Sequence, residues 1–258
     1  MRRCIEMRLK GKIAIVTGAA EGIGAATAEV FAEQGAAVVV GDIDPGGSAV
    51  CDRIVAAGGL AAFLRADISV EADVAALMTE AEARFGGVDI LVNNAAAFVL
   101  KGLEATPDDW HRSLDVNVIG TSLCSRHAAE RMKRRGGGAI VNLASISSFV
   151  AQPQFITYSA TKAAILQMTR NMALDLAPHG IRVNCVCPGT ILTRASRDHM
   201  ARVGMSLEEF IAAEAPKHLL GRVGDPREVA WPILFLASDE ASFITGTHLM
   251  VDGGYTAI

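Results

Sequence analysis

The sequence has few cysteines, few aromatic residues and little excess of charge, and each shortage excludes a class of protein. Its 258 residues include 5 cysteines and 5% aromatic residues, and 24 Lys+Arg stand against 28 Asp+Glu, for a net charge of -4. This balance lacks the positive charge with which proteins bind nucleic-acid backbones. The cysteines are odd in number and none has C-x-x-C spacing, so neither a disulfide framework nor a zinc site is expected. We interpret them as reduced core thiols: Cys4, Cys51, Cys124, Cys185 and Cys187.

Long hydrophobic runs are also missing. No stretch approaches the roughly 20 apolar residues of a membrane-spanning helix. The N-terminus is basic, but charged residues from Glu6 to Lys12 interrupt the apolar run that a signal peptide requires. We therefore expect a soluble, cytoplasmic protein. Apolar residues make up 51% of the chain, enough for a large core, and no composition break divides it, so a single domain over residues 1–258 is predicted.

Short aliphatic runs alternate with segments of helical periodicity. The runs are nearly continuous, which indicates strands of a parallel sheet covered by helices on both faces, and the predicted fold class is a doubly wound α/β fold. A proline after a capping side chain predicts three helix starts, at Asp44-Pro45, Thr106-Pro107 and Asp225-Pro226. Strands are expected at 13–16, 37–40, 88–92, 139–143, 182–186 and 249–251, and helices at 23–34, 45–57, 70–85, 107–134, 155–177 and 226–237.

A glycine-rich turn, Thr17-Gly18-Ala19-Ala20-Glu21-Gly22-Ile23-Gly24, lies between the first predicted strand and the first predicted helix. Glycines here let backbone N–H groups and the helix dipole approach a pyrophosphate, although they also serve close helix–strand packing. Asp42 follows the second strand, at the distance from the turn expected of a carboxylate that binds the adenosine ribose. A turn-forming or capping aspartate is the alternative.

Charge predicts which dinucleotide this site binds. Asp42 can accept hydrogen bonds from both ribose hydroxyls of NAD but repels the 2'-phosphate of NADP. Glu21 adds a second negative charge, and no arginine or lysine occupies either position. NAD is therefore the predicted cofactor.

Tyr158 and Lys162 share one face of the helix predicted at 155–177. Ionising a phenol near neutral pH requires lowering its pKa from about 10 by roughly 2–3 units, or ~3–4 kcal/mol. An ammonium about 4 Å away, at an effective dielectric constant near 20, supplies about 4 kcal/mol. Tyr158 can then exchange a proton with a substrate oxygen; an amphipathic helix with a solvated lysine is the alternative.

Ser145 and Asn117 are further candidates for this site. Ser145 follows the strand at 139–143, at the carboxyl end where ligands bind in open α/β sheets. Asn117 lies inside the 107–134 helix, where a buried amide is costly unless it is hydrogen-bonded. Either residue alone is more often a turn or local hydrogen-bonding residue.

Taken together and in this order, the glycine turn, Asn93-Asn94-Ala95, Asn117, Ser145 and Tyr158-x-x-x-Lys162 resemble the motifs of the short-chain dehydrogenase/reductase family. The resemblance extends over essentially the whole chain and implies a Rossmann-type fold. It implies that Ser145 orients the substrate oxygen and that Tyr158 exchanges its proton. It also implies that Lys162 binds the nicotinamide ribose and that Asn117 holds a proton-relaying water.

The same resemblance implies which residues hold the dinucleotide. The glycine turn and Ile23 lie at the pyrophosphate, Asp67-Ile68 at adenine, and the segment 188–193 over the nicotinamide. Ala96 stands where the family usually has glycine, and we expect it to narrow the cofactor cleft only slightly. The implied cofactor-binding set is Gly18, Glu21, Gly22, Ile23, Gly24, Asp42, Asp67, Ile68, Asn94, Tyr158, Lys162, Pro188, Gly189, Ile191 and Thr193.

We expect an NAD-dependent oxidoreductase in which the Tyr158 phenolate removes the hydroxyl proton of a secondary alcohol, cyclic or polyol, while hydride passes to nicotinamide C4. A 3-oxoacyl-type carbonyl reductase is the alternative, and a dinucleotide-binding protein without catalysis is a third hypothesis. Segment 194–220 is predicted to be a helical flap over the substrate or a plain surface excursion. The histidines are expected at the surface without a metal role, and contact with a substrate is the alternative for His199 and His218. The resemblance implies a homotetramer paired through the 107–134 and 155–177 helices.

Overall fold

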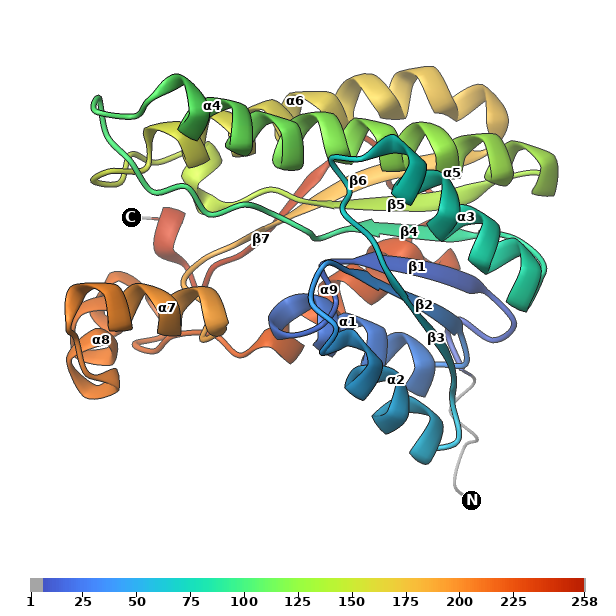
Figure 1. The fold of residues 1–258 in the computed structure, drawn as a ribbon, viewed down its shortest axis with the longest axis horizontal. Coiled ribbons are helices and arrows are strands. Elements are labelled where there is room, and N and C mark those ends of the chain that lie inside the picture. Colours follow the sequence, from blue (N-terminus) through green and yellow to red (C-terminus); the bar gives the residue numbers. More distant parts are fainter. Residues whose placement is uncertain (1–6, 258) are drawn as a thin grey trace.

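The computed structural model describes residues 7–257 and contains one parallel sheet (Figure 1). Within these residues the strand order is β3-β2-β1-β4-β5-β6-β7, with every neighbouring pair parallel. The predicted α/β fold of doubly wound, Rossmann type is therefore confirmed. The strands are β1 Ile13–Thr17, β2 Ala37–Asp42, β3 Leu60–Arg65, β4 Ile90–Asn93, β5 Gly138–Leu143, β6 Ile181–Pro188 and β7 His248–Val251.

Helices cover both faces of the sheet (Figure 1). One layer contains α1 (Gly22–Glu33), α2 (Gly47–Ala56) and α9 (Pro226–Ala237). The other contains α3 (Glu71–Phe85), α4 (Pro107–Leu114), α5 (Thr121–Arg135) and α6 (Ile156–Leu176). Figure 1 shows α7 (Arg194–Val203) and α8 (Leu207–Glu214), in orange, set apart from these layers.

Two apolar cores explain why the strands are continuously hydrophobic. Successive side chains of a strand point to opposite faces of the sheet. Val16 and Val38 accordingly belong to the core beneath α1, α2 and α9, whereas Ile15 and Val39 belong to the core beneath α3 and α5. Both faces are buried, so apolar residues are needed at every position of these central strands.

Two of the three predicted helix starts are confirmed, and one is wrong. Thr106 and Asp225 cap α4 and α9 with reciprocal side-chain hydrogen bonds. At the third site α2 begins at Gly47 rather than at Pro45. The Asp44 carboxylate instead accepts a hydrogen bond from the Gly46 N–H at 2.8 Å, which forms a tight turn. Strand β3 is also absent from the strands that the aliphatic runs predict, because its residues are only partly buried at the sheet edge.

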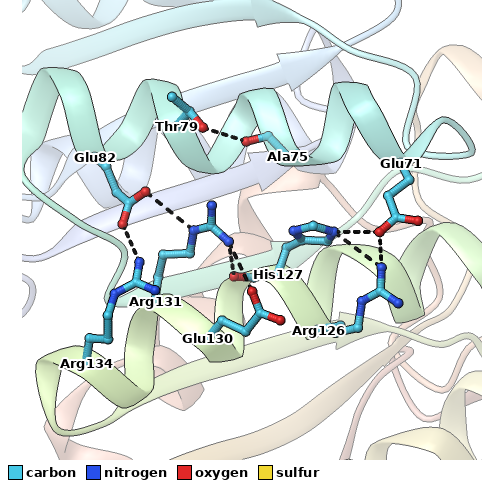
Figure 2. A network of polar contacts seen from close by, with 9 residues as sticks. All are labelled: Glu71, Ala75, Thr79, Glu82, Arg126, His127, Glu130, Arg131 and Arg134. Atoms are coloured by element: carbon cyan, nitrogen blue, oxygen red, sulfur yellow. Dashed lines mark hydrogen bonds and ion pairs between the residues drawn. The ribbon is translucent and has the colours of Figure 1, made fainter.

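Ion pairs join α3 to α5 at the surface (Figure 2). Glu82 pairs with Arg131 at 3.5 Å and with Arg134 at 2.6 Å. Glu71 pairs with His127 at 3.1 Å and with Arg126. Exposed pairs of this kind contribute at most about 1 kcal/mol each. The apolar core between the two helices and the sheet therefore supplies most of their packing energy.

Three sequence-based predictions concern cysteines, membranes and metals. Cys51, Cys124, Cys185 and Cys187 are buried free thiols, as predicted, whereas Cys4 lies outside the described residues. Among residues 7–257, no helix has the length and apolar character needed to cross a membrane. Over the same residues, no cluster of histidine, cysteine or acidic side chains is arranged to hold a metal ion.

Candidate active site

The glycine turn joins the carboxyl end of β1 to α1 and leaves no room for side chains at two of its glycines. Gly18 has a φ of +62°, and a Cβ there would lie 2.6 Å from the Cα of Ala95. A Cβ on Gly24 would lie 2.2 Å from the Gly18 carbonyl oxygen. The turn therefore folds tightly onto the helix N-terminus, as a backbone cradle for a pyrophosphate requires.

Asn94 and Thr17 brace this turn from the end of the neighbouring strand. The Asn94 side chain donates hydrogen bonds to the carbonyls of Thr17 at 3.0 Å and Gly18 at 2.7 Å. The Thr17 hydroxyl accepts from the backbone N–H groups of Asn94 and Ala95. Asn94 thus fixes the shape of the cradle, and its predicted contact with adenosine stays a prediction. Thr17 was not singled out by the sequence; its signal is a polar residue at the end of an apolar strand.

The Asp42 carboxylate lies beside the glycine turn at the end of β2. It accepts hydrogen bonds from the Ala20 N–H at 2.8 Å and the Asp44 N–H at 2.9 Å. The second bond is that of a turn-forming aspartate, the alternative interpretation, while the first places the carboxylate next to the cradle. Asp42 remains partly exposed, and its predicted contact with the adenosine ribose stays a prediction.

Asp67 and Ile68 follow β3 at the same carboxyl edge. Asp67 accepts hydrogen bonds from the backbone N–H and the hydroxyl of Ser69 at 2.9 and 2.7 Å. Ile68 is buried, and its side chain contacts the position where Gly120 would carry a Cβ, at 2.9 Å. A larger residue at Gly120 would therefore displace Ile68.

Arg194, at the first position of α7, is a charged residue of this site that the sequence did not reveal. Its guanidinium lies 3.0 Å from the Asp44 carboxylate and 3.6 Å from that of Glu21. Burial raises the pKa of Glu21, and Arg194 opposes that shift. The sequence predicts that Glu21 adds a second negative charge beside Asp42. In the structure this charge is partly neutralised, because Glu21 is paired with Arg194 from a distant part of the chain.

Residues 188–193, here called the nicotinamide loop, run from the last residue of β6 to the residue before α7. Gly189 donates a backbone hydrogen bond to Val251 at 3.1 Å, and Leu192 donates one to Gly224 at 3.0 Å. The Thr193 side chain lies 3.3 Å from the position that a Cβ of Gly22 would occupy. The loop therefore lies against the glycine turn. Pro188 is buried at its start, and Ile191 packs on the core beneath α1, α2 and α9.

Segment 194–220 is helical, as predicted for a flap. It contains α7, α8 and a short helical turn, Ala215–Lys217. Met200 and Phe210 are buried and anchor the two helices. That this flap covers the substrate stays a prediction.

Ser145, Tyr158 and Lys162 come together at the carboxyl end of β5. Ser145 lowers the pKa of the neighbouring Tyr158 side chain. The Ser145 hydroxyl accepts a hydrogen bond from the Ser147 N–H at 3.1 Å and donates one to the Ser147 hydroxyl at 3.2 Å. The Lys162 ammonium donates to the Leu143 carbonyl at 2.6 Å and lies 5.5 Å from the centre of the Tyr158 ring. All three predicted side chains are buried in one cluster.

Burial controls the acidity of this cluster more strongly than expected. It raises the pKa of Tyr158 well above its ordinary value, and Ser145 opposes the shift only in part. Burial also lowers the pKa of Lys162 to about 8. The prediction that Lys162 alone brings the phenol near neutrality is therefore wrong, because the desolvation of the buried phenol dominates its pKa.

Asn117 lies in a π-helical turn, Asp115–Gly120, that interrupts the single helix predicted over 107–134. Its side chain accepts a hydrogen bond from the Ala97 N–H at 2.7 Å. It donates to the Ala97 carbonyl at 3.1 Å and to the Thr161 hydroxyl at 3.0 Å. This buried amide thus has three partners and joins the segment after β4 to α6. Its predicted role in holding a water stays a prediction.

Aromatic and polar side chains surround the Tyr158 ring. Phe98 stacks on it with ring centres 5.0 Å apart, and Phe155 meets it edge-on at 5.9 Å. Gln152, on the loop before α6, accepts a hydrogen bond from the Ser147 hydroxyl. Ala96, two residues before Phe98, is half-buried. The surroundings are therefore mostly apolar, with one polar pair.

Comparisons with known proteins show which family this chain resembles. A family model described as enoyl-(acyl carrier protein) reductase matches residues 18–256. Cis-4-hydroxycyclohexanecarboxylate dehydrogenase of Sinomonas cyclohexanicum is 44% identical, over 96% of this chain and 97% of its own. A 2,5-dichloro-2,5-cyclohexadiene-1,4-diol dehydrogenase of Sphingobium indicum is 42% identical, over 97% and 99%.

An NAD-dependent glycerol dehydrogenase of Listeria innocua is 39% identical, over 97% of this chain and 96% of its own. The similarity to all three dehydrogenases extends over nearly the full length of each. The predicted family is therefore confirmed. The chain belongs to the short-chain dehydrogenase/reductase family, as an oxidoreductase that acts on alcohol substrates.

Proposed function

We propose that the protein is an NAD-dependent dehydrogenase of a cyclic secondary alcohol, with Tyr158 as the proton-exchanging residue. The observation that carries the proposal is that the Tyr158 and Ser145 side chains are both buried at the carboxyl end of β5, where Ser145 lowers the pKa of Tyr158. Two neighbouring hydroxyls can both form hydrogen bonds with a third oxygen, that of the substrate. Ligands bind at this edge of open α/β sheets.

The residues at this edge fit a nicotinamide dinucleotide. The cradle at Gly18 and Gly24 excludes any side chain, which leaves backbone N–H groups of the turn to hold a pyrophosphate. Asp42 would hold the adenosine ribose, and Lys162 the nicotinamide ribose. A bound oxidised nicotinamide supplies a hydride acceptor and a positive charge.

The protein's own residues carry the proton chemistry. Ser145 donates a hydrogen bond to the substrate oxygen and orients it. Tyr158 has to be ionised to accept the hydroxyl proton as the carbonyl forms, and because burial raises its pKa, the positive charges of Lys162 and of a bound oxidised nicotinamide would have to offset that shift. Lys162 is protonated at neutral pH, because its pKa is about 8, and its charge favours the phenolate. Asn117 holds the Ala97 segment, and through it Phe98, in register with Tyr158.

NAD is favoured by Asp42, since its carboxylate repels a 2'-phosphate. Arg194 weakens this preference without removing it. Its charge is shared among Asp44, Glu21 and Asp198. The Asp42 carboxylate is bonded to backbone N–H groups, and among the described residues no basic side chain lies within hydrogen-bond distance of it.

A six-membered ring alcohol is the proposed substrate class. Phe98 and Phe155 give the space around Tyr158 flat apolar walls, and Phe98 is 52% exposed, so part of its ring is free to contact a ligand. The Ser147–Gln152 pair provides hydrogen-bond partners for a second polar substituent. Two of the relatives are named for substituted cyclohexane or cyclohexadiene alcohols, which supports this choice.

A screen of alcohols tests the proposal. Purified protein is incubated with NAD or NADP and with cyclic, polyol or acyclic secondary alcohols at alkaline pH, and formation of the reduced nicotinamide is followed by absorbance. We expect the highest kcat/KM for ring alcohols with NAD. A higher kcat/KM for 3-oxoacyl substrates with the reduced cofactor would replace this proposal by carbonyl reduction. Dinucleotide binding without turnover of any substrate would indicate a non-catalytic protein. The homotetramer, the single domain and the cytoplasmic location stay predictions.

A further inference from the structure

His218 is a buried histidine in contact with the nicotinamide loop, where the sequence predicted a surface residue. It follows the helical turn Ala215–Lys217 at the end of the flap and is only 4% exposed. Its ring meets Tyr255 edge-on, with centres 5.3 Å apart. A Cβ on Gly189 would lie 3.1 Å from its Nε2 atom, so the ring lies directly against the loop. The surface prediction failed because the chain after α8 turns back beneath the loop.

The two ring nitrogens of His218 have partners that define its protonation state. Nε2 lies 3.2 Å from the backbone nitrogen of Thr190, a group that can only donate. Nδ1 lies 3.0 Å from the carbonyl oxygen of Glu214, a group that can only accept. The imidazole must therefore be neutral, with its proton on Nδ1 and its lone pair on Nε2. A second proton on Nε2 would point at the Thr190 N–H and break that hydrogen bond.

A second contact joins the same two segments. The Thr190 hydroxyl donates to the Glu214 carboxylate at 3.1 Å. The middle of the nicotinamide loop is thus held to the end of the flap by both the backbone and the side chain of Thr190. We propose that His218 is a positioning residue, and that its neutral form holds the loop in the conformation that binds the dinucleotide while its protonation releases the loop. This inference rests on the proposed function for its consequence, but not for the geometry of the contact.

Charged groups on each neighbouring element influence this protonation. Glu214, on the flap, favours the imidazolium, but its carboxylate is already bonded to Thr190 and to the Lys217 ammonium at 2.6 Å. Asp252, after β7, bonds to Gly254 and Thr256. Arg222 lines one pocket together with His218 and is paired with Glu228 at 2.6 Å. Each of these acids therefore has a partner already, and protonation of His218 has to break the Thr190 contact to occur.

The protein without substrate allows the first test. NMR of the His218 ring nitrogens should show the Nδ1-protonated neutral form at about pH 8. At that pH the Thr190 amide should have a high protection factor against hydrogen exchange, and this protection factor should fall as the pH is lowered and the histidine is protonated. An Nε2-protonated ring, or a Thr190 amide whose protection is independent of pH, would overturn the proposal. This result does not depend on whether the protein is a dehydrogenase.

Three variants allow the second test, with fluorescence titration of NADH between about pH 5.5 and pH 8 as the readout. In the wild type we expect binding about tenfold weaker at the lower pH, since one backbone hydrogen bond is replaced by a repulsive contact. His218→Gln keeps an acceptor that does not titrate, so its binding should vary less than about twofold over this range. His218→Phe keeps a ring without an acceptor, so its binding should be weak at both pH values.

His179→Gln is the matched control, because His179 is exposed and follows α6. It should behave as the wild type does. Equal pH dependence in the wild type and His218→Gln would overturn the proposed release, even if both bind NADH tightly. A Michaelis constant for NAD that depends on pH more steeply in the wild type than in His218→Gln, while kcat has the same pH dependence in both proteins, would agree with a positioning role. Failure of all proteins to bind NADH would instead reject the proposed function and leave the first test to decide on the contact.

Discussion

Replacing Asn117 by alanine tests how the π-helical turn supports the active site. The variant loses three hydrogen bonds, of 2.7, 3.1 and 3.0 Å, that join Asn117 to Ala97 and Thr161. Each such bond contributes about 1 kcal/mol net, so the free energy of unfolding should fall by about 3 kcal/mol. For a chain of this length, that corresponds to a decrease in Tm of roughly 6–12 °C.

The same substitution should reduce turnover. Ala97 precedes Phe98, which stacks on Tyr158 at 5.0 Å, so releasing Ala97 loosens the support of the catalytic ring. A displacement of about 1 Å at a catalytic group costs on the order of 100-fold in rate, and we expect kcat to fall by roughly 10- to 100-fold.

Differential scanning calorimetry and initial-rate measurements check both effects. Asn171→Ala, at an exposed position of α6, is the control and should change stability by less than about 0.5 kcal/mol. An Asn117→Ala protein with the Tm and kcat of the wild type would refute the reasoning.

Two further substitutions test the charges of the site. Asp42→Ser should weaken NAD binding and raise the ratio of NADP to NAD turnover by about tenfold or more, measured from initial rates, and an unchanged ratio would show that Asp42 does not select the cofactor. Lys162→Met should abolish turnover yet raise Tm near neutral pH. The folded protein lowers the pKa of Lys162 from 10.5 to about 8, so the buried ammonium destabilises the fold by about 3 kcal/mol below pH 8. Wild-type stability should therefore rise relative to the variant between about pH 8 and 10.5, and thermal melts that show no such convergence would contradict the assigned burial cost.

Local patterns in the sequence were sufficient to predict every strand of the described sheet except β3 and to place the candidate residues that follow these strands. Continuous apolar runs identified the central strands, and the spacing of Tyr158 and Lys162 placed both on one helix face. The π-helical turn at Asn117 was not predictable in this way, because an inserted residue hardly disturbs the periodicity of a 28-residue segment.

Contacts between distant segments were not predictable. Arg194 reaches Asp44 across 150 residues, and His218 reaches Thr190 across 28. Both depend on how the flap packs against the sheet edge, for which the sequence contains no local signal. The predicted low pKa of Tyr158 was wrong for a related reason. Helix spacing shows that Lys162 is near, but not that both groups are buried or that the ammonium is bonded to the Leu143 carbonyl.

The central claim is that the Tyr158 hydroxyl exchanges the proton of the substrate. Tyr158→Phe removes that oxygen and keeps the ring between Phe98 and Phe155. The most direct measurement is single-turnover formation of reduced nicotinamide by this variant, alongside its affinity for NADH. The account predicts a rate lower by about 10²- to 10⁴-fold with an NADH dissociation constant within about twofold of the wild type. A variant that binds NADH normally and retains more than about a tenth of the wild-type rate would contradict it.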